Sequence, residues 1–101
     1  MNMFRWIVKM IRDEFEIDEA ILTRTATLET DCGLLIEQIE AILGVVSQSF
    51  GITFPSATLD EVVRLEEFCM LASWLKGLYK CPPFISTEFE ADCRAINPGC
   101  L

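Results

Sequence analysis

Histidine is absent from the 101 residues of this chain, and cationic residues are scarce. Without an imidazole, the commonest general base at neutral pH is missing, so serine–histidine and cysteine–histidine nucleophile pairs are excluded. Eight lysines and arginines stand against sixteen aspartates and glutamates, giving a formal charge of −8. Binding to nucleic acid requires a basic patch on the protein, so we expect no nucleic-acid partner. A protein with a basic surface would complement this charge.

Long hydrophobic runs are also absent, although apolar residues make up 51% of the chain and the mean hydropathy is +0.35. A membrane span needs roughly 18 to 20 consecutive apolar residues. The longest candidate, Ala41 to Phe54, is interrupted by three polar residues at 47–49. The first residues carry neither the basic region nor the cleavage site of a secretory signal. We therefore expect a cytoplasmic protein with no membrane span.

The cysteine pattern argues against a disulfide framework and against a zinc site. Five cysteines occur at irregular spacing, with no pair separated by two residues: Cys32, Cys69, Cys81, Cys93 and Cys100. A structural zinc would need four of these thiolates, because no histidine is available. Cys69 falls within a helical apolar pattern and is expected in the core. The three cysteines after residue 80 could pair under oxidation.

Catalytic patterns are equally sparse. The five glycines are scattered and form no phosphate-binding loop. The acidic pairs Asp13-Glu14, Asp60-Glu61 and Glu66-Glu67 fall at expected helix ends, where carboxylates are solvated or interact with the helix dipole. We therefore expect no enzymatic activity, no cofactor and no bound metal.

Apolar residues recur at helical spacing in three stretches, which predicts an all-α fold. In residues 3–16 they are Phe4, Ile7, Val8, Ile11 and Phe15. In a central helix they are Ile39, Ile42, Leu43, Val46 and Phe50. In a last main helix they are Leu65, Phe68, Leu71, Ala72, Leu75 and Tyr79. Asp31 is the predicted N-cap of the central helix and Gly51 its left-handed end.

Between and after these stretches lie shorter segments. Residues 18–30 are an expected loop, with Ile21, Leu22 and Leu28 tucked between helices. Thr58 and Thr87 each precede a glutamate by three residues, the spacing of a capping box, and predict short helices over residues 59–64 and 87–94. Two prolines at 82–83 end the bundle. The sequence thus predicts a helical bundle over residues 1–80 and a C-terminal extension over residues 81–101.

Three segments together resemble the acyl carrier proteins. "FEIDEAILTRTATLETDCG" is similar to the family's first loop, whose Leu-acid-x-Asp-x-Gly turn corresponds to Leu28, Glu29, Asp31 and Gly33. "IEQIEAILGVVSQSFGITFP" resembles the second helix and its exit, and "LDEVVRLEEFCMLASWL" resembles the third and fourth helices. The resemblance covers about residues 3–80. It implies a four-helix bundle made of three main helices and a short third helix.

The chain departs from that family at its modified residue. In acyl carrier proteins an Asp-Ser-Leu triplet follows the turn, and its serine carries the 4′-phosphopantetheine arm. The matching residues here are Leu35, Ile36 and Glu37, so Ile36 stands in place of the serine. No hydroxyl side chain occurs between Thr30 and Ser47. We therefore expect no phosphopantetheine group.

The start of the central helix is the predicted partner-binding site. Its candidate residues are Leu34, Leu35, Ile36, Glu37, Glu40, Ala41 and Val45. Alternatively, the apolar line of Leu34, Ala41 and Val45 packs beneath the C-terminal extension. The expected function is that of a non-enzymatic, carrier-protein-like domain that binds a protein. The alternatives are an atypical functional carrier in lipid or polyketide synthesis, and a small acidic immunity or inhibitor protein.

Overall fold

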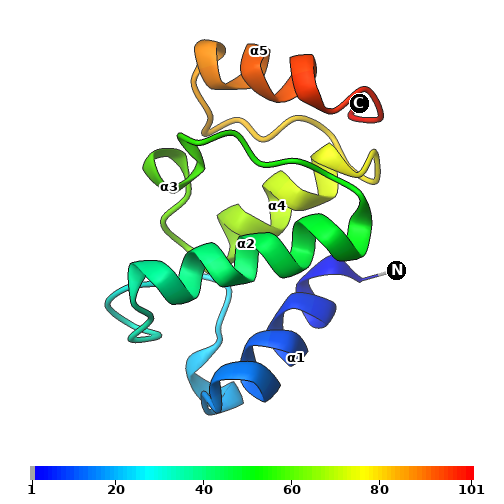
Figure 1. Ribbon diagram of the computed structural model, residues 1–101. Coiled ribbons are helices and arrows are strands. Elements are labelled where there is room, and N and C mark those ends of the chain that lie inside the picture. Colours follow the sequence, from blue (N-terminus) through cyan, green and yellow to red (C-terminus); the bar gives the residue numbers. More distant parts are fainter. Residues whose placement is uncertain (1) are drawn as a thin grey trace.

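A computed structural model describes residues 2–101, and every regular element in this range is a helix (Figure 1). The elements are α1 (Met3–Phe15), the 3₁₀ helix η1 (Glu19–Ile21), α2 (Ile36–Phe50), α3 (Thr58–Glu61), α4 (Leu65–Leu75) and α5 (Thr87–Ile96). The predicted all-α class is confirmed for these residues. None of these helices is long and apolar enough to cross a membrane.

The core is built where α1 packs against α4, with α2 lying across them (Figure 1). Its largest fully buried side chains are Trp74, Phe68, Ile7, Ile11, Ile42, Leu65, Leu71 and Leu75. Trp6 and Phe50 meet edge to face, with ring centroids 4.8 Å apart, and join α1 to the end of α2. Burial of this apolar surface is the main force holding the helices together.

The predicted core stripe of the central helix is largely confirmed. Ile39, Ile42, Val46 and Phe50 are buried, whereas Leu43 is half-buried. Gly51 ends α2 with φ +66°, the left-handed conformation that was predicted.

The predicted beginning of this helix is wrong. Asp31 does not cap α2, because α2 begins five residues later, at Ile36. The Asp31 carboxylate instead accepts a hydrogen bond from the Thr27 backbone N–H, 2.9 Å away. The Thr27 carbonyl in turn accepts from the Cys32 backbone N–H at 3.0 Å. Residues 27–32 therefore form a closed turn of their own before the helix starts.

The expected capping boxes are also replaced by other contacts. Thr58 is the first residue of α3, not its cap, and its hydroxyl donates to the Pro55 carbonyl at 2.6 Å. Its expected partner, Glu61, accepts a hydrogen bond from the Ser86 backbone N–H at 2.8 Å. Helix α3 consequently ends at Glu61 and does not reach residue 64. Ser86, not Thr87, caps α5, and its hydroxyl accepts from the Phe89 N–H at 3.2 Å.

Helix α4 is shorter than predicted and ends at Leu75. Gly77 adopts φ +82°, and a Cβ at this position would lie 2.6 Å from the Gly99 carbonyl oxygen. The chain therefore leaves the helix where the C-terminal segment approaches its backbone. Tyr79, predicted to continue the buried stripe, is 49% exposed.

The loop before the turn contributes two of its three expected anchors. Leu22 and Leu28 are buried, each 4% exposed. Ile21 is 44% exposed, because it lies in η1 and points away from the core. Ala26 is buried instead.

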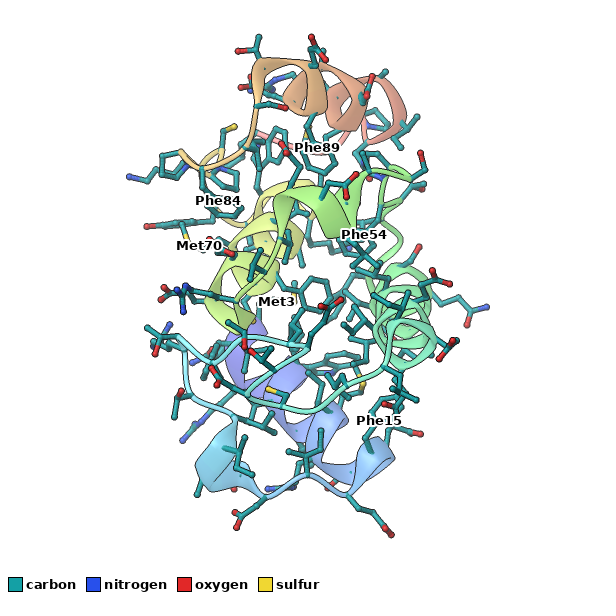
Figure 2. All side chains as sticks on the ribbon, turned by 90° about the vertical axis from the view of Figure 1, so that its left-hand side faces the viewer. Met3, Phe15, Phe54, Met70, Phe84 and Phe89 are labelled. Carbon is teal, nitrogen blue, oxygen red and sulfur yellow. The ribbon has the colours of Figure 1, made fainter. Side chains whose placement is uncertain are left out.

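The residues after α4 pack on the bundle through α5. Phe89 and Cys93 are buried, and Figure 2 shows Phe89 between α5 and the rest of the bundle. The buried Asn97 side chain exchanges two 2.8 Å hydrogen bonds with the Thr53 backbone and donates a third to the Cys93 carbonyl. At the chain end, the Trp74 indole N–H donates to the Leu101 carbonyl at 2.7 Å. Polar contacts thus hold the end of the chain on the bundle.

Replacing Phe50 by alanine tests the register of α2. Phe50 is 6% exposed and contacts Trp6, so we expect the Phe50→Ala variant to lose about 3–5 kcal/mol of unfolding free energy. Urea denaturation followed by circular dichroism measures this loss. The exposed Val45 on the same helix supplies the control, since Val45→Ala should change stability by less than about 0.5 kcal/mol. A near-neutral Phe50→Ala would contradict the described packing.

Candidate functional site

The start of α2 is positioned by backbone hydrogen bonds from the preceding loop. The Leu28 N–H donates to the Val63 carbonyl at 3.0 Å, and the Leu34 N–H donates to the Leu28 carbonyl at 3.1 Å. Through these two bonds the loop at Leu28 lies between the segment at Val63, before α4, and the segment at Leu34, before α2. Leu34 is drawn inward by this arrangement and is only 4% exposed. Its assignment as a partner-binding residue is therefore wrong.

The residues that follow Leu34 point outward. Leu35 is 63% exposed and Ile36 is 46% exposed, so two large apolar side chains lie next to each other in solvent. Farther along α2, Val45 is 38% exposed. Together with the exposed Glu37, Glu40 and Ala41, these residues form what we call the α2 surface: Leu35, Ile36, Glu37, Glu40, Ala41 and Val45.

The alternative in which the apolar line packs beneath the C-terminal extension is wrong. Ala41 and Val45 are exposed, so nothing in residues 2–101 covers them. Helix α5 lies instead above the segment that links α2 to α3, on the far side of that segment from α2 (Figure 1). The extension therefore leaves the α2 surface open.

The N-cap of α2 is chemically unusual. Leu35 occupies the cap position with extended backbone angles (φ −76°, ψ 159°), and its side chain makes no hydrogen bond. The Gln38 side-chain oxygen accepts from the Leu35 N–H at 2.8 Å, so only half of a capping box is present. Leucine is among the least favourable residues at this position, whereas serine or aspartate would bond a free amide of the first turn. Stability of the helix does not explain the choice of leucine.

A small hollow adjoins the α2 surface and was missed by sequence reasoning. Its volume is about 160 Å³, and its walls come from the loop, α2 and the α3–α4 region: Thr27, Leu28, Glu29, Thr30, Ile39, Leu59, Val62 and Val63. Val63 is 54% exposed, whereas Val62 is buried. Because α3 ends at Glu61, these two valines lie in extended backbone and point to opposite sides. The sequence predicts a helix over residues 59–64, and in a helix these two valines would not alternate between opposite sides.

The layer beneath this hollow is filled. Leu28, Ile39, Ile42, Leu43, Thr58, Leu59, Val62 and Phe68 enclose a space whose accessible volume is about 0 Å³. An acyl chain could enter only if these side chains moved apart. The arrangement therefore offers an apolar, acidic outer surface, not a preformed internal cavity for a ligand.

The thiol in the turn before α2 is not activated. Cys32 is buried, and burial, followed by the neighbouring Asp31 charge, raises the pKa of its thiol. A raised pKa keeps the group protonated and unreactive at neutral pH. Within residues 2–101, no group of three cysteine, aspartate or glutamate side chains is placed to hold a metal ion. The chemistry available at the α2 surface is that of binding.

All five cysteines are free thiols. Cys69 is buried in the core as predicted, and burial raises the pKa of its thiol to about 12. Burial likewise raises the pKa of Cys93 to about 12. Cys81 and Cys100 are half-buried.

Comparison with known proteins identifies no relative: no protein-family model matches the chain, and no curated protein sequence matches it.

Replacing Leu35 by serine tests whether leucine at this cap position stabilises the helix. Because serine can accept a hydrogen bond from an amide of the first turn, we expect Leu35→Ser to raise the unfolding free energy by about 0.5–2 kcal/mol. Thermal and urea denaturation measure the change, with Leu35→Ala as the control that removes the side chain without adding a cap. A destabilised Leu35→Ser protein would show instead that Leu35 has a structural role.

Proposed function

We propose that this chain is a non-enzymatic, acyl-carrier-protein-like domain that carries no phosphopantetheine group and binds a partner protein through the α2 surface. The observation that carries the proposal is the exposure of Leu35 and Ile36, side by side, at the start of α2. Large apolar side chains that remain in water cost free energy unless a partner covers them. Ile36 stands where the acyl carrier resemblance places the modified serine.

The order of helices supports the carrier-like part of the proposal. A long α1 is followed by a loop with buried leucines, then α2, a one-turn α3 and α4, as in the resemblance drawn from the sequence. Helix α5 is an addition to that plan. The filled layer between α2, α3 and α4 supports a role that does not depend on carrying an acyl chain inside the bundle.

Charge supports a partner with a basic surface. Glu37 and Glu40 belong to the α2 surface, and Glu29 lines the adjoining hollow, whereas neither contains a lysine or arginine. Carboxylates around an apolar centre steer a cationic partner and fix its orientation, while the apolar side chains provide most of the affinity. In this mechanism Leu35 and Ile36 enter an apolar recess of the partner, and Glu37 and Glu40 face its lysines or arginines.

Incubation with a phosphopantetheinyl transferase and coenzyme A tests the absence of the prosthetic group. We expect the intact mass of the wild-type chain to stay unchanged, because isoleucine cannot accept a phosphodiester. The matched control restores the family's triplet through Leu35→Asp/Ile36→Ser/Glu37→Leu, and this variant should gain one phosphopantetheine. A mass increase of the wild-type chain would contradict the proposal. A folded triple variant that gains no mass would remove support for the carrier-like part.

Two matched isoleucines test the binding surface. Ile36 on α2 is 46% exposed and Ile96 at the end of α5 is 44% exposed, so Ile36→Ser and Ile96→Ser remove nearly equal apolar area from different faces. In affinity capture from the native host's lysate, we expect the partner recovered with the wild type to be lost with Ile36→Ser and kept with Ile96→Ser. Raising the salt should weaken the complex, since its charges lie at the rim. Equal losses with both variants would contradict the assignment.

A further inference from the structure

Half of the cationic residues of this acidic chain line one hollow on the face of α1. The hollow has a volume of about 850 Å³, and Arg5, Lys9, Arg12 and Arg24 contribute to its walls. Glu19 is the single carboxylate among its lining residues. The chain as a whole has eight cationic and sixteen anionic residues, so this concentration opposes the overall charge. A charge distribution of this kind creates a local positive potential on an otherwise negative molecule.

Three of these cations are available to a ligand. Arg12 is engaged by Asp13 at 3.0 Å and by Glu19 at 3.2 Å. Arg5 and Lys9, one helical turn apart on α1, are exposed and take part in none of the ion pairs found in residues 2–101. The exposed Arg24 lies over the Phe4 ring, with its guanidinium carbon 4.5 Å from the ring centroid. This stacking holds the guanidinium plane while its N–H groups remain free to donate.

A second hollow continues this surface and adds apolar area. Its volume is about 410 Å³, and it shares Asn2, Phe4 and Arg24 with the first. Met70, Leu78 and Tyr79 line its other side, and Leu78 and Tyr79 are 51% and 49% exposed. Figure 2 shows Met70 of α4 at the outer edge of the molecule. We call the two adjoining hollows the α1 groove; it combines an apolar wall with a cationic wall of four residues, and it contains two carboxylates, Glu19 and the half-buried Glu66.

We propose that the α1 groove binds an acidic amphipathic segment of a partner protein. Carboxylates of such a segment pair with Arg5, Lys9 and Arg24, and its apolar side chains cover Phe4, Leu78 and Tyr79. A short segment contacts only the groove, whereas a long polyanion such as a nucleic acid would also meet the surrounding carboxylates of a chain with charge −8. The charge of the groove therefore selects a short acidic peptide.

This second surface is independent of the α2 surface. The groove and the α2 surface with its hollow have no residue in common, and their charges are opposite. The domain can accordingly hold a basic partner on α2 and an acidic one on α1 at the same time. Binding in the α1 groove does not depend on the function proposed above, whereas the adaptor role rests on both surfaces.

Fluorescence anisotropy with a labelled peptide tests the groove. The probe is a helical peptide of glutamate and leucine at amphipathic spacing, about 16 residues and so roughly 24 Å long. The wild-type chain should bind this probe saturably, and a peptide with lysine in place of glutamate should not bind. The affinity should fall at higher salt. Absence of saturable binding up to about 1 mM would overturn the proposal.

Charge-matched double variants locate the site. Arg5→Ser/Lys9→Ser should weaken binding of the probe about tenfold or more, because both cations face the acidic peptide. Lys76→Ser/Arg94→Ser removes the same charge from residues that line neither hollow, and should weaken binding less than about twofold. Circular dichroism and thermal unfolding verify that all variants are folded. Equal weakening by the two double variants would overturn the groove as the site.

Three further measurements decide the nature of the ligand. Single-stranded DNA that binds more tightly than the peptide, with the same loss in Arg5→Ser/Lys9→Ser, would overturn the protein segment in favour of nucleic acid. Self-association in sedimentation that this double variant abolishes would assign the groove to a second copy of the chain and overturn the proposal. Ile36→Ser should bind the probe as tightly as the wild type. This result keeps the test of the α1 groove separate from the test of partner binding at the α2 surface.

Discussion

The pairing of loop residues 24–28 with residues 63–66, where α4 begins, is the constraint on which both surfaces of this protein depend. The N–H groups of Leu28, Leu65 and Glu66 donate to carbonyls of the opposite segment at 2.9–3.0 Å. The Arg64 side chain adds a fourth hydrogen bond, to the Thr25 carbonyl at 2.8 Å. This pairing closes a long loop onto the entry to α4, so its closure entropy is offset by four hydrogen bonds and by buried leucines. It fixes the turn that precedes α2 at one end and the backbone of Arg24 at the other.

Because one pairing positions both surfaces, their geometry is preformed in the free protein. The turn releases Leu35 and Ile36 into solvent, and Arg24 reaches the ring of Phe4 at the start of α1. Preformed surfaces lose little conformational entropy when a partner binds. For the two proposed partners, the opposite charges of the α2 surface and the α1 groove would serve discrimination, since a partner attracted to one surface is repelled by the other.

Periodicity predicted the buried faces from the sequence, whereas local capping signals failed to predict where the helices begin. A buried stripe repeats over several turns and reflects the whole core, so α1, α2 and α4 were found. A capping box rests on two polar residues, and each can bond elsewhere. Asp31 bonds to Thr27 and Glu61 to Ser86, a residue 25 positions away that no local pattern connects to it. The α1 groove was likewise beyond the sequence, because Arg24 joins Arg5 and Lys9 only through the fold.

The candidate residues of α2 were found because apolar residues stand where the carrier resemblance places a serine. The same apolar residues also make the start of the helix energetically unfavourable. A helix start normally carries a polar cap, and a polar residue in place of Leu35 would stabilise α2. The chain instead places an apolar side chain in water, at a position where neither the core nor α5 covers it. Residues that are unfavourable for local stability concentrate at functional sites, because they contribute free energy to binding instead of to folding. The cost at Leu35 is small beside the buried core of Trp74, Phe68 and Ile42, so the bundle can sustain it, and the proposed partner would remove it.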